Sequence, residues 1–332
     1  MKEQIKQLYK TCFDDSETFV EYYFQHRYTD SRNLCIERNG MPVAALQTLF
    51  YPMTFGGNLC ATSYLSAVCT HPNYRNQGLM RDLLTHTHQS LAARGVWASM
   101  LIPAESWLFD VYAKQQYTTI FYKETELITI DQLAAESTCV VEKLIPECLS
   151  EVFAFFNEKM LERAYGVMHT EDDFKTLVGA LALEHGYVLV ASTAEQLSGV
   201  AFVHPSGKVL DIVYNSNLER ATLLRTAGQH CQIHEILCFV APTTGRKQPL
   251  GMMRVISAEK FLKMYAAMHY DCTKTMCLID DELPENNGCY TLSQGLCVKT
   301  EVMNQDNLWN MSQLATFLFQ DINPYMSLMM DE

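Results

Sequence analysis

The 332-residue sequence lacks several features that would assign it to common classes of protein. No uninterrupted apolar run approaches the ~18 residues that a membrane-spanning helix needs. The first ten residues mix Lys, Glu and Gln and contain no apolar core of a signal peptide. The twelve cysteines, scattered from Cys12 to Cys297, include no C-x-x-C pair. We therefore expect a cytoplasmic protein with no membrane span, whose cysteines are reduced and mostly buried.

Clusters of Lys and Arg are also absent, and the formal net charge is −13. Because nucleic-acid binding depends on clustered cationic side chains that meet phosphates, we expect no nucleic-acid partner. A cationic small molecule or peptide suits this charge better, although acidic charge also serves solubility alone. Neither the P-loop pattern G-x-x-x-x-G-K-[ST] nor the dinucleotide pattern G-x-G-x-x-G occurs in the sequence.

The first third of the sequence predicts an α/β (α+β) arrangement with a mixed, mostly antiparallel sheet. Apolar spacing behind Ser16 predicts a capped amphipathic helix. Asn39-Gly40 between two β-rich runs predicts a hairpin, and "CATSYLSAVCT" predicts a further strand. A helix follows and ends at Gly95. Beyond it we expect a strand in "VWASMLIP", a short helix in "SWLFDVYAKQQ" and a strand pair in "YTTIFYKETELITI".

The rest of the chain divides into two further blocks, so we predict domains over 1–133, 134–246 and 247–332. The second block repeats the alternation of strand and helix without an Arg-bearing Gly turn, which favours a structural partner domain without its own cofactor. The third block has a helix in "SAEKFLKMYAAM" and a hairpin pattern around Asn286-Asn287-Gly288. Its end is unusually apolar for a terminus.

The most informative stretch is "HPNYRNQGLMRDLL", which follows the apolar strand directly. Pro72 stops the strand, and the turn leads into a helix whose first backbone amides point at incoming ligands. Gly78 allows the backbone to approach a bulky group, and Arg75 supplies a fixed positive charge. The turn therefore predicts an anion site at a helix N-terminus that suits a pyrophosphate.

The pattern Arg75-x-x-Gly78-x-Met80 after an apolar strand resembles the acetyl-CoA signature of the GNAT superfamily of N-acetyltransferases. Downstream, "SWLFDVYAKQQYTTIF" is similar to the family's Y-x-x-x-G-F segment, with Tyr112 as the Tyr and Gln116 in place of the usual Gly. Met80, where the family commonly has Gly or Ala, and the order of the blocks resemble the enhanced intracellular survival (Eis) group. That resemblance implies a catalytic GNAT domain, a degenerate GNAT-like domain and a small α+β sterol carrier protein-like domain.

The resemblance also implies roles for particular residues. Tyr112 would be the general acid, because a phenol of pKa about 10 is protonated at neutral pH and can protonate a thiolate of pKa about 8.5. The α-carboxylate of Glu332 would be the base, with the apolar tail in the active site and Glu105 as the alternative acidic residue. The residues that would hold acetyl-CoA, as cosubstrate, are Val68, Cys69 and Thr70 at the pantetheine and Arg75, Asn76, Gln77, Gly78, Leu79 and Met80 at the pyrophosphate.

The leading hypothesis is an acetyl-CoA-dependent N-acetyltransferase acting on a primary amine of a cationic substrate, such as an aminoglycoside-like molecule, a polyamine or lysine. The alternative is a non-catalytic acyl-CoA- or lipid-binding scaffold, and a homo-oligomer is compatible with either. We expect no metal, since His230 and His234 have no third ligand in view. The acidic run 280–287 lacks calcium-loop spacing and reads as a solvated turn.

Overall fold

The computed structural model of the protein describes residues 1–133, 139–194, 196–242, 247–301 and 308–331. Two compact units make up the chain: Met1–Ile120 with Leu250–Ile322, called unit 1, and Phe121–Pro249 with Asn323–Glu332, called unit 2. Each unit joins segments that are far apart in the sequence. The three-domain division stays a prediction, and both of its boundaries adjoin residues outside the described ranges.

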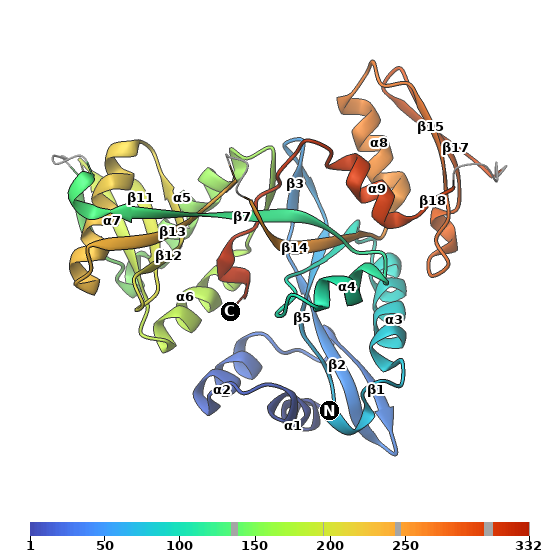
Figure 1. Ribbon diagram of the computed structural model, residues 1–332, viewed down its shortest axis with the longest axis horizontal. Coiled ribbons are helices and arrows are strands. Elements are labelled where there is room, and N and C mark those ends of the chain that lie inside the picture. Colours follow the sequence, from blue (N-terminus) through green and yellow to red (C-terminus); the bar gives the residue numbers. More distant parts are fainter. Residues whose placement is uncertain (134–138, 195, 243–246, 302–307, 332) are drawn as a thin grey trace. The chain divides into compact units, whose positions relative to one another are not determined.

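The first part of unit 1 confirms the predicted alternation of helices and strands (Figure 1). The Ser16 side chain accepts a hydrogen bond from the backbone of Phe19, and Asn39 and Gly40 both have positive φ in the hairpin turn. The elements are α1 (Lys2–Cys12), α2 (Glu17–His26), β1 (Asn33–Arg38), β2 (Met41–Phe50), β3 (Met53–Phe55), β4 (Asn58–Cys60), β5 (Thr62–Thr70), η1 (Pro72–Tyr74), α3 (Leu79–Ala93), β6 (Ala98–Leu101) and α4 (Leu108–Ala113).

Within unit 1 the main sheet has the strand order β1-β2-β5-β6-β14, where β14 is Gln248–Val255. The pairs β1–β2, β2–β5 and β6–β14 are antiparallel, and β5–β6 is parallel. The leucines of α3 predicted to form one buried face are each at most 3% exposed: Leu79, Leu83, Leu84 and Leu91. The sheet therefore includes a strand from the third block, paired directly with β6.

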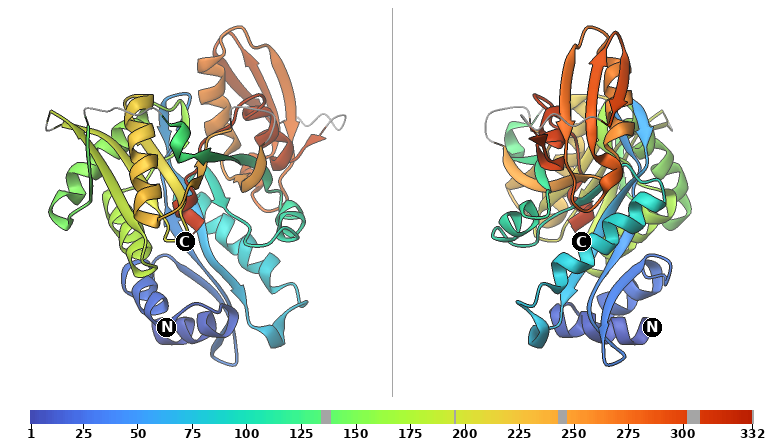
Figure 2. Two further views of the ribbon diagram at one scale, coloured as in Figure 1. Left: turned by 60° about the vertical axis from the view of Figure 1, so that its left-hand side comes forward. Right: turned by 90° about the vertical axis from the view of Figure 1, so that its right-hand side faces the viewer.

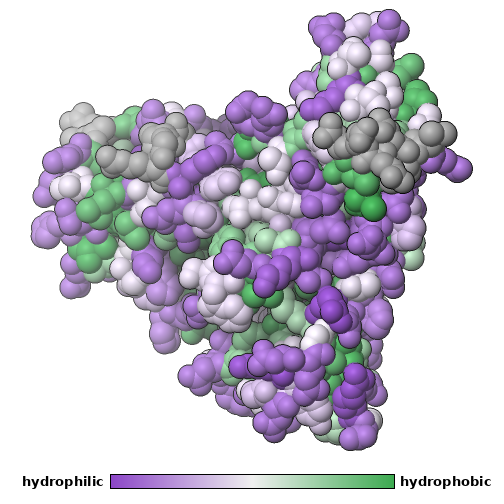
Figure 3. All heavy atoms as spheres, turned by 45° about the vertical axis from the view of Figure 1, so that its right-hand side comes forward, coloured by the Kyte–Doolittle hydropathy of each residue, from purple (hydrophilic) through white to green (hydrophobic). Residues whose placement is uncertain are grey.

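The C-terminal part of unit 1 is a four-stranded sheet with two helices on one face (Figure 2). Its strand order is β17-β16-β15-β18, and the predicted hairpin is the antiparallel pair β15–β16. On the face shown in Figure 3, green hydrophobic patches lie in this part, and the exposed apolar residues of its edge strand include Leu296 and Val298. The elements are α8 (Ala258–Met268), β15 (Lys274–Leu278), η4 (Pro284–Asn286), β16 (Gly288–Ser293), β17 (Leu296–Thr300), β18 (Leu308–Trp309) and α9 (Met311–Leu318).

One cysteine pair corrects the expectation that all cysteines are reduced. Cys277 and Cys289 face each other in the β15–β16 ladder and form a disulfide. The expectation rested on the absence of C-x-x-C pairs, whereas these two cysteines become neighbours through strand register, which the spacing of twelve residues does not reveal.

Unit 2 contains a sheet of order β7-β13-β12-β11-β10-β8 (Figure 1). The predicted strand pair over 117–130 is wrong, because residues 118–129 form the single long strand β7. The elements are β7 (Thr118–Thr129), η2 (Ile130–Gln132), β8 (Val140–Lys143), η3 (Pro146–Cys148), α5 (Leu149–Leu161), β9 (Tyr165–Val167), α6 (Glu171–Leu183), β10 (Tyr187–Thr193), β11 (Gln196–Val203), β12 (Lys208–Tyr214), α7 (Asn217–Cys231), β13 (Glu235–Val240) and η5 (Leu328–Asp331).

The apolar tail packs within unit 2. Tyr325 donates its backbone N–H to the carbonyl of Tyr165 at 3.0 Å and accepts from Val167 at 2.9 Å. Its hydroxyl donates to the buried carboxylate of Asp211. Met326, Ser327, Leu328, Met329 and Met330 are each at most 9% exposed. The tail is therefore ordered by backbone, polar and apolar contacts as far as residue 330.

Candidate functional site

Strand β5 leads to the predicted anion site and is irregular just before its end. Its ladder with β2 shifts register between the partners of Ala45 and Gln47, and Ala67 has φ of 54°. The parallel ladder with β6 covers only Thr62–Tyr64, while β5 continues to Thr70. Beyond Tyr64, the described part of the chain supplies no strand on that side of β5. A ligand with amide groups can therefore pair with this edge.

The turn after β5 has the properties of an anion site. Helix α3 begins after Gly78, which has φ of 79° and supplies no side chain to cap the first amides. The turn residues Arg75, Asn76, Gln77 and Gly78 are all exposed. Uncapped amides at the positive end of a helix dipole favour a negative group.

Arg75 and two cysteines surround the end of β5. Nε of Arg75 donates to the carbonyl of Thr70 at 3.2 Å, which holds the guanidinium beside the strand end. The hydrogen bond from Cys69 and the charge of Arg75 lower the pKa of Cys12, and the same hydrogen bond together with burial raises the pKa of Cys69. Cys69 therefore stays a protonated, buried thiol at neutral pH, which agrees with its interpretation as a small core residue.

Tyr112 lies in α4 and is 5% exposed. Its ring belongs to the core cluster that also contains Leu79, and Val68 and Met80 pack against the same cluster. Burial raises the pKa of its phenol. In the part of the chain that the structure describes, the phenol oxygen has no hydrogen-bond partner. The structure thus places Tyr112 in one core cluster with Leu79, Val68 and Met80 and leaves its O–H group uncommitted.

The structure describes only one of the two acidic residues predicted for the active site. Glu105 is exposed, and its backbone carbonyl accepts from Leu108 at 3.0 Å. Glu332 lies outside the described residues.

A buried polar network in unit 1 was missed by the sequence analysis. The Tyr117 hydroxyl lies 2.6 Å from Ser99 Oγ and 3.0 Å from His88 Nε2. His88 Nδ1 lies 2.6 Å from Glu282 Oε2, which also lies 3.2 Å from Nη2 of Arg254. Tyr117, Ser99, His88 and Arg254 are all at most 1% exposed. The one available signal was Arg254, a charge within the apolar run "MMRVIS".

Arg254 anchors the acidic run 280–287, so the expectation of a solvated turn is wrong for Asp280. Nη2 of Arg254 donates to Asp280 Oδ1 at 2.8 Å, and neither side chain is exposed. Asp280 also accepts from the backbone of Glu282 and from Asn286. In addition, Nε of Arg254 donates to the carbonyl of Gln115 at 3.2 Å, in the turn that follows α4. The run is held by a buried arginine that lies outside its own sequence.

The network predicts a stability change in mild acid. Burial lowers the pKa of His88 to about 4, against an ordinary value of 6.5. Between these values the unfolded chain binds a proton that the folded chain does not, so stability falls as the pH decreases through this window. From pH 7 to pH 5 we expect the free energy of unfolding to drop by about 2 kcal/mol more in the wild type than in His88→Gln.

Urea denaturation at the two pH values measures this difference. His86→Gln is the matched control, because His86 is exposed on the same helix and should keep the wild-type pH dependence. An equal drop in the wild type and His88→Gln would show that His88 does not titrate in this way.

Unit 2 also has a strand followed by a helix, β12 and α7, but that helix is capped. The Ser216 side chain accepts from the backbone of Leu218, and Glu219 lies in the first turn. Both helices have an acidic residue in the first turn, Asp82 in α3 and Glu219 in α7, so the difference between them is the side-chain cap, which gives an amide of α7 a partner and leaves α3 without one.

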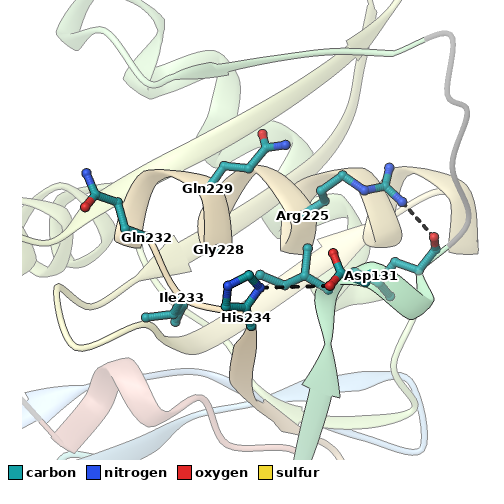
Figure 4. A pocket seen from close by; sticks show the side chains of 9 residues that line it. Asp131, Arg225, Gly228, Gln229, Gln232, Ile233 and His234 are labelled. Atoms are coloured by element: carbon teal, nitrogen blue, oxygen red, sulfur yellow. Dashed lines mark hydrogen bonds and ion pairs between the residues drawn. The ribbon is translucent and has the colours of Figure 1, made fainter.

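Two hollows of unit 2 are lined by none of the predicted site residues that the structure describes. One, of about 560 Å³, lies at the ends of β12 and β13 and contains the Arg220–Glu126 ion pair. The other, of about 580 Å³, is shown in Figure 4. There Arg225 donates to the carbonyl of Leu133 at 2.7 Å, and the exposed His234 and Asp131 lie 3.9 Å apart.

Among the described residues, no group of three or more His, Cys, Asp or Glu side chains is placed to hold a metal ion. Likewise, no described helix has the length and apolar character needed to cross a membrane.

Residues 2–120 match the family model described as "Acetyltransferase (GNAT) domain". The chain therefore contains a GNAT acetyltransferase domain, and the predictions of the GNAT fold and of an acetyltransferase are confirmed. The match includes β5, the Arg75 turn and α4, which carry the candidate site. A sequence comparison with proteins of curated description gives no match.

Solved structures share the fold over nearly the whole chain. A GCN5-related N-acetyltransferase from Anabaena variabilis is 18% identical, with 95% of this chain and 87% of that one covered and a TM-score of 0.74. A probable N-acyltransferase from Enterococcus faecalis is 14% identical, with coverage of 96% and 87% and a TM-score of 0.78. Eis1 from Mycobacterium abscessus is 14% identical, with coverage of 95% and 86% and a TM-score of 0.70.

Proposed function

We propose that this protein transfers the acetyl group of acetyl-CoA to a primary amine of a cationic substrate. The observation that carries the proposal is the uncapped N-terminus of α3, which follows the exposed turn containing Arg75. The amides from Asn76 to Met80 would bind the pyrophosphate, together with the Arg75 guanidinium. The edge of β5 at Val68, Cys69 and Thr70 would pair with the amides of the pantetheine arm, since the β6 ladder stops before these residues.

The proposed reaction is a direct attack. The amine nitrogen forms a bond to the thioester carbonyl carbon, the C–S bond breaks, and the thiolate takes the phenol proton of Tyr112. Burial supports this role, because a raised pKa keeps Tyr112 protonated at neutral pH. The attacking nitrogen loses its own proton to a base. The uncommitted O–H of Tyr112 suits a donor that acts only when the thiolate forms.

The resemblance to the Eis group supplies the finer parts of the proposal. These are a degenerate second GNAT-like domain, a sterol carrier protein-like third domain and the α-carboxylate of Glu332 as the base. A cationic amine such as an aminoglycoside-like molecule, a polyamine or lysine agrees with the net charge of −13. A cytoplasmic location and a homo-oligomer belong to the same proposal.

The release of free thiol from acetyl-CoA tests the function directly, with a panel of polyamines, aminoglycosides, amino acids and lysine peptides as acceptors. Turnover with at least one amine supports the proposal. Binding of coenzyme A in calorimetry without thiol release from any acceptor would favour the scaffold alternative. Absence of any heat of binding would contradict the cofactor site itself.

Arg75→Ala is expected to weaken coenzyme A binding by about tenfold or more, because a charge-assisted hydrogen bond to phosphate is lost. Isothermal titration calorimetry measures the Kd. Arg38→Ala is the matched control, since Arg38 is also exposed but lies in β1, outside the turn. An unchanged Kd for Arg75→Ala would remove Arg75 from the cofactor site.

A further inference from the structure

Tyr117 joins the elements that build the candidate site, although it is too deeply buried to reach a ligand. It is 1% exposed and lies immediately before β7. Its hydroxyl contacts Ser99 in β6 and His88 in α3, the helix whose N-terminus forms the anion site. Displacing this side chain would therefore disturb contacts to both elements at once.

The hydrogen bonds around Tyr117 have one consistent direction. Glu282 can only accept as a carboxylate, so the neutral His88 carries its proton on Nδ1 and donates it to Glu282. His88 Nε2 is then an acceptor, and Tyr117 must donate to it. Ser99 in turn donates to the Tyr117 oxygen. In this chain of hydrogen bonds, the donors Ser99, Tyr117 and His88 each have an acceptor. Glu282 is the last acceptor, and Nη2 of Arg254 lies 3.2 Å from its Oε2.

Tyr117 also contacts Tyr112 directly. The two ring centroids lie 5.8 Å apart with an interplanar angle of 66°, an edge-to-face contact. The Tyr117 backbone N–H donates to the Tyr112 carbonyl at 3.2 Å. Because the Tyr112 phenol has no hydrogen-bond partner among the described residues, packing alone orients its ring. The Tyr117 ring is the fixed member of this pair.

We propose that Tyr117 is a positioning residue for Tyr112, held in place by the hydrogen-bond chain from Ser99 to Glu282. This inference rests on the proposed function, in which Tyr112 donates the proton to the departing thiolate. It also gives Arg254 and Glu282 a role in positioning Tyr112, because they close the acceptor end of the chain. The hydroxyl of Tyr117 itself touches neither substrate nor cofactor.

The test is a double-mutant cycle with Tyr117→Phe and Tyr112→Phe in the full chain, measured with the best amine of the acceptor panel. We expect Tyr117→Phe alone to lower kcat by about tenfold, since a small misplacement of a reacting group slows the chemical step. The KM for acetyl-CoA should stay within about twofold, because the turn residues are unchanged. In the Tyr112→Phe background, Tyr117→Phe should have no further effect on kcat. Tyr270→Phe, at an exposed tyrosine, is the control and should leave kcat unchanged.

The outcomes separate this inference from the proposed function. If Tyr112→Phe loses turnover while Tyr117→Phe keeps the wild-type kcat, the positioning role is wrong and the proposed acid stands. The same holds if Tyr117→Phe lowers kcat equally in both backgrounds, which would indicate a structural role only. Wild-type turnover of Tyr112→Phe would overturn both proposals. If Tyr117→Phe does not fold, Ser99→Ala replaces it in the cycle, because it removes the hydrogen bond that Ser99 donates to Tyr117.

Discussion

Replacing Tyr112 by Phe is expected to lower kcat by roughly 100- to 10,000-fold, the range for loss of a positioned general acid. Phe keeps the ring that packs in the core with Leu79, so the fold and the cofactor turn should be preserved. Only the uncommitted O–H group is removed. Steady-state thiol release gives kcat and the KM for acetyl-CoA, and we expect the KM to change little.

The pH dependence adds a second readout for Tyr112. Because burial raises the pKa of the Tyr112 phenol above its ordinary value, the phenol stays protonated up to about pH 9, and the ratio of wild-type kcat to Tyr112→Phe kcat should be the same at pH 7 and pH 9. Tyr122→Phe is a suitable control, since Tyr122 lies in β7 and is not one of the residues assigned to the site, so it should retain wild-type turnover. A kcat for Tyr112→Phe within about threefold of the wild type would exclude Tyr112 as the acid.

Local features of the fold followed directly from the sequence. The hairpin was predictable because Asn39 and Gly40 both tolerate the positive φ that a two-residue turn requires. The buried face of α3 and its stop just before Gly95 were predictable because helical spacing and a left-handed glycine after the C-cap depend on residues close together in the chain. The Arg75 turn was predictable for the same reason, since its backbone amides and its glycine lie within a few residues of one another in the chain.

Long-range partners were not predictable in this way. The sequence gives no reason why Arg254 should meet Asp280, because the pairing depends on β14 lying next to β6 and on the position of the acidic run. We expected Asp280 to be exposed to solvent because acidic side chains are mostly exposed. Burial of such a side chain requires a buried cation as its partner. The chain through Tyr117 and His88 was missed for the same reason, as its four side chains come from separate segments.

Arg254→Met is expected to destabilise the protein by about 3–5 kcal/mol, the second large effect that the structure predicts. Arg254 is fully buried and donates to Asp280 at 2.8 Å and to the carbonyls of Gln115 and Val255. Met has a similar volume but offers no donor, so the buried carboxylate of Asp280 would lose its counter-charge. Equilibrium urea denaturation at pH 7 measures the loss, which is a large fraction of the stability of an ordinary domain.

The loss of stability in Arg254→Met should come from the uncompensated charge of Asp280 rather than from a change of side-chain shape. The double variant Arg254→Met with Asp280→Asn distinguishes these two causes. Asn keeps an acceptor for the backbone of Glu282 but carries no charge, so we expect the double variant to recover part of the stability. Lys263→Met, which removes an exposed cation paired with Glu259, should cause no measurable change. If Arg254→Met loses less than about 1 kcal/mol, the ion pair is dispensable, and the β6–β14 ladder together with apolar packing is enough to hold the C-terminal part of unit 1.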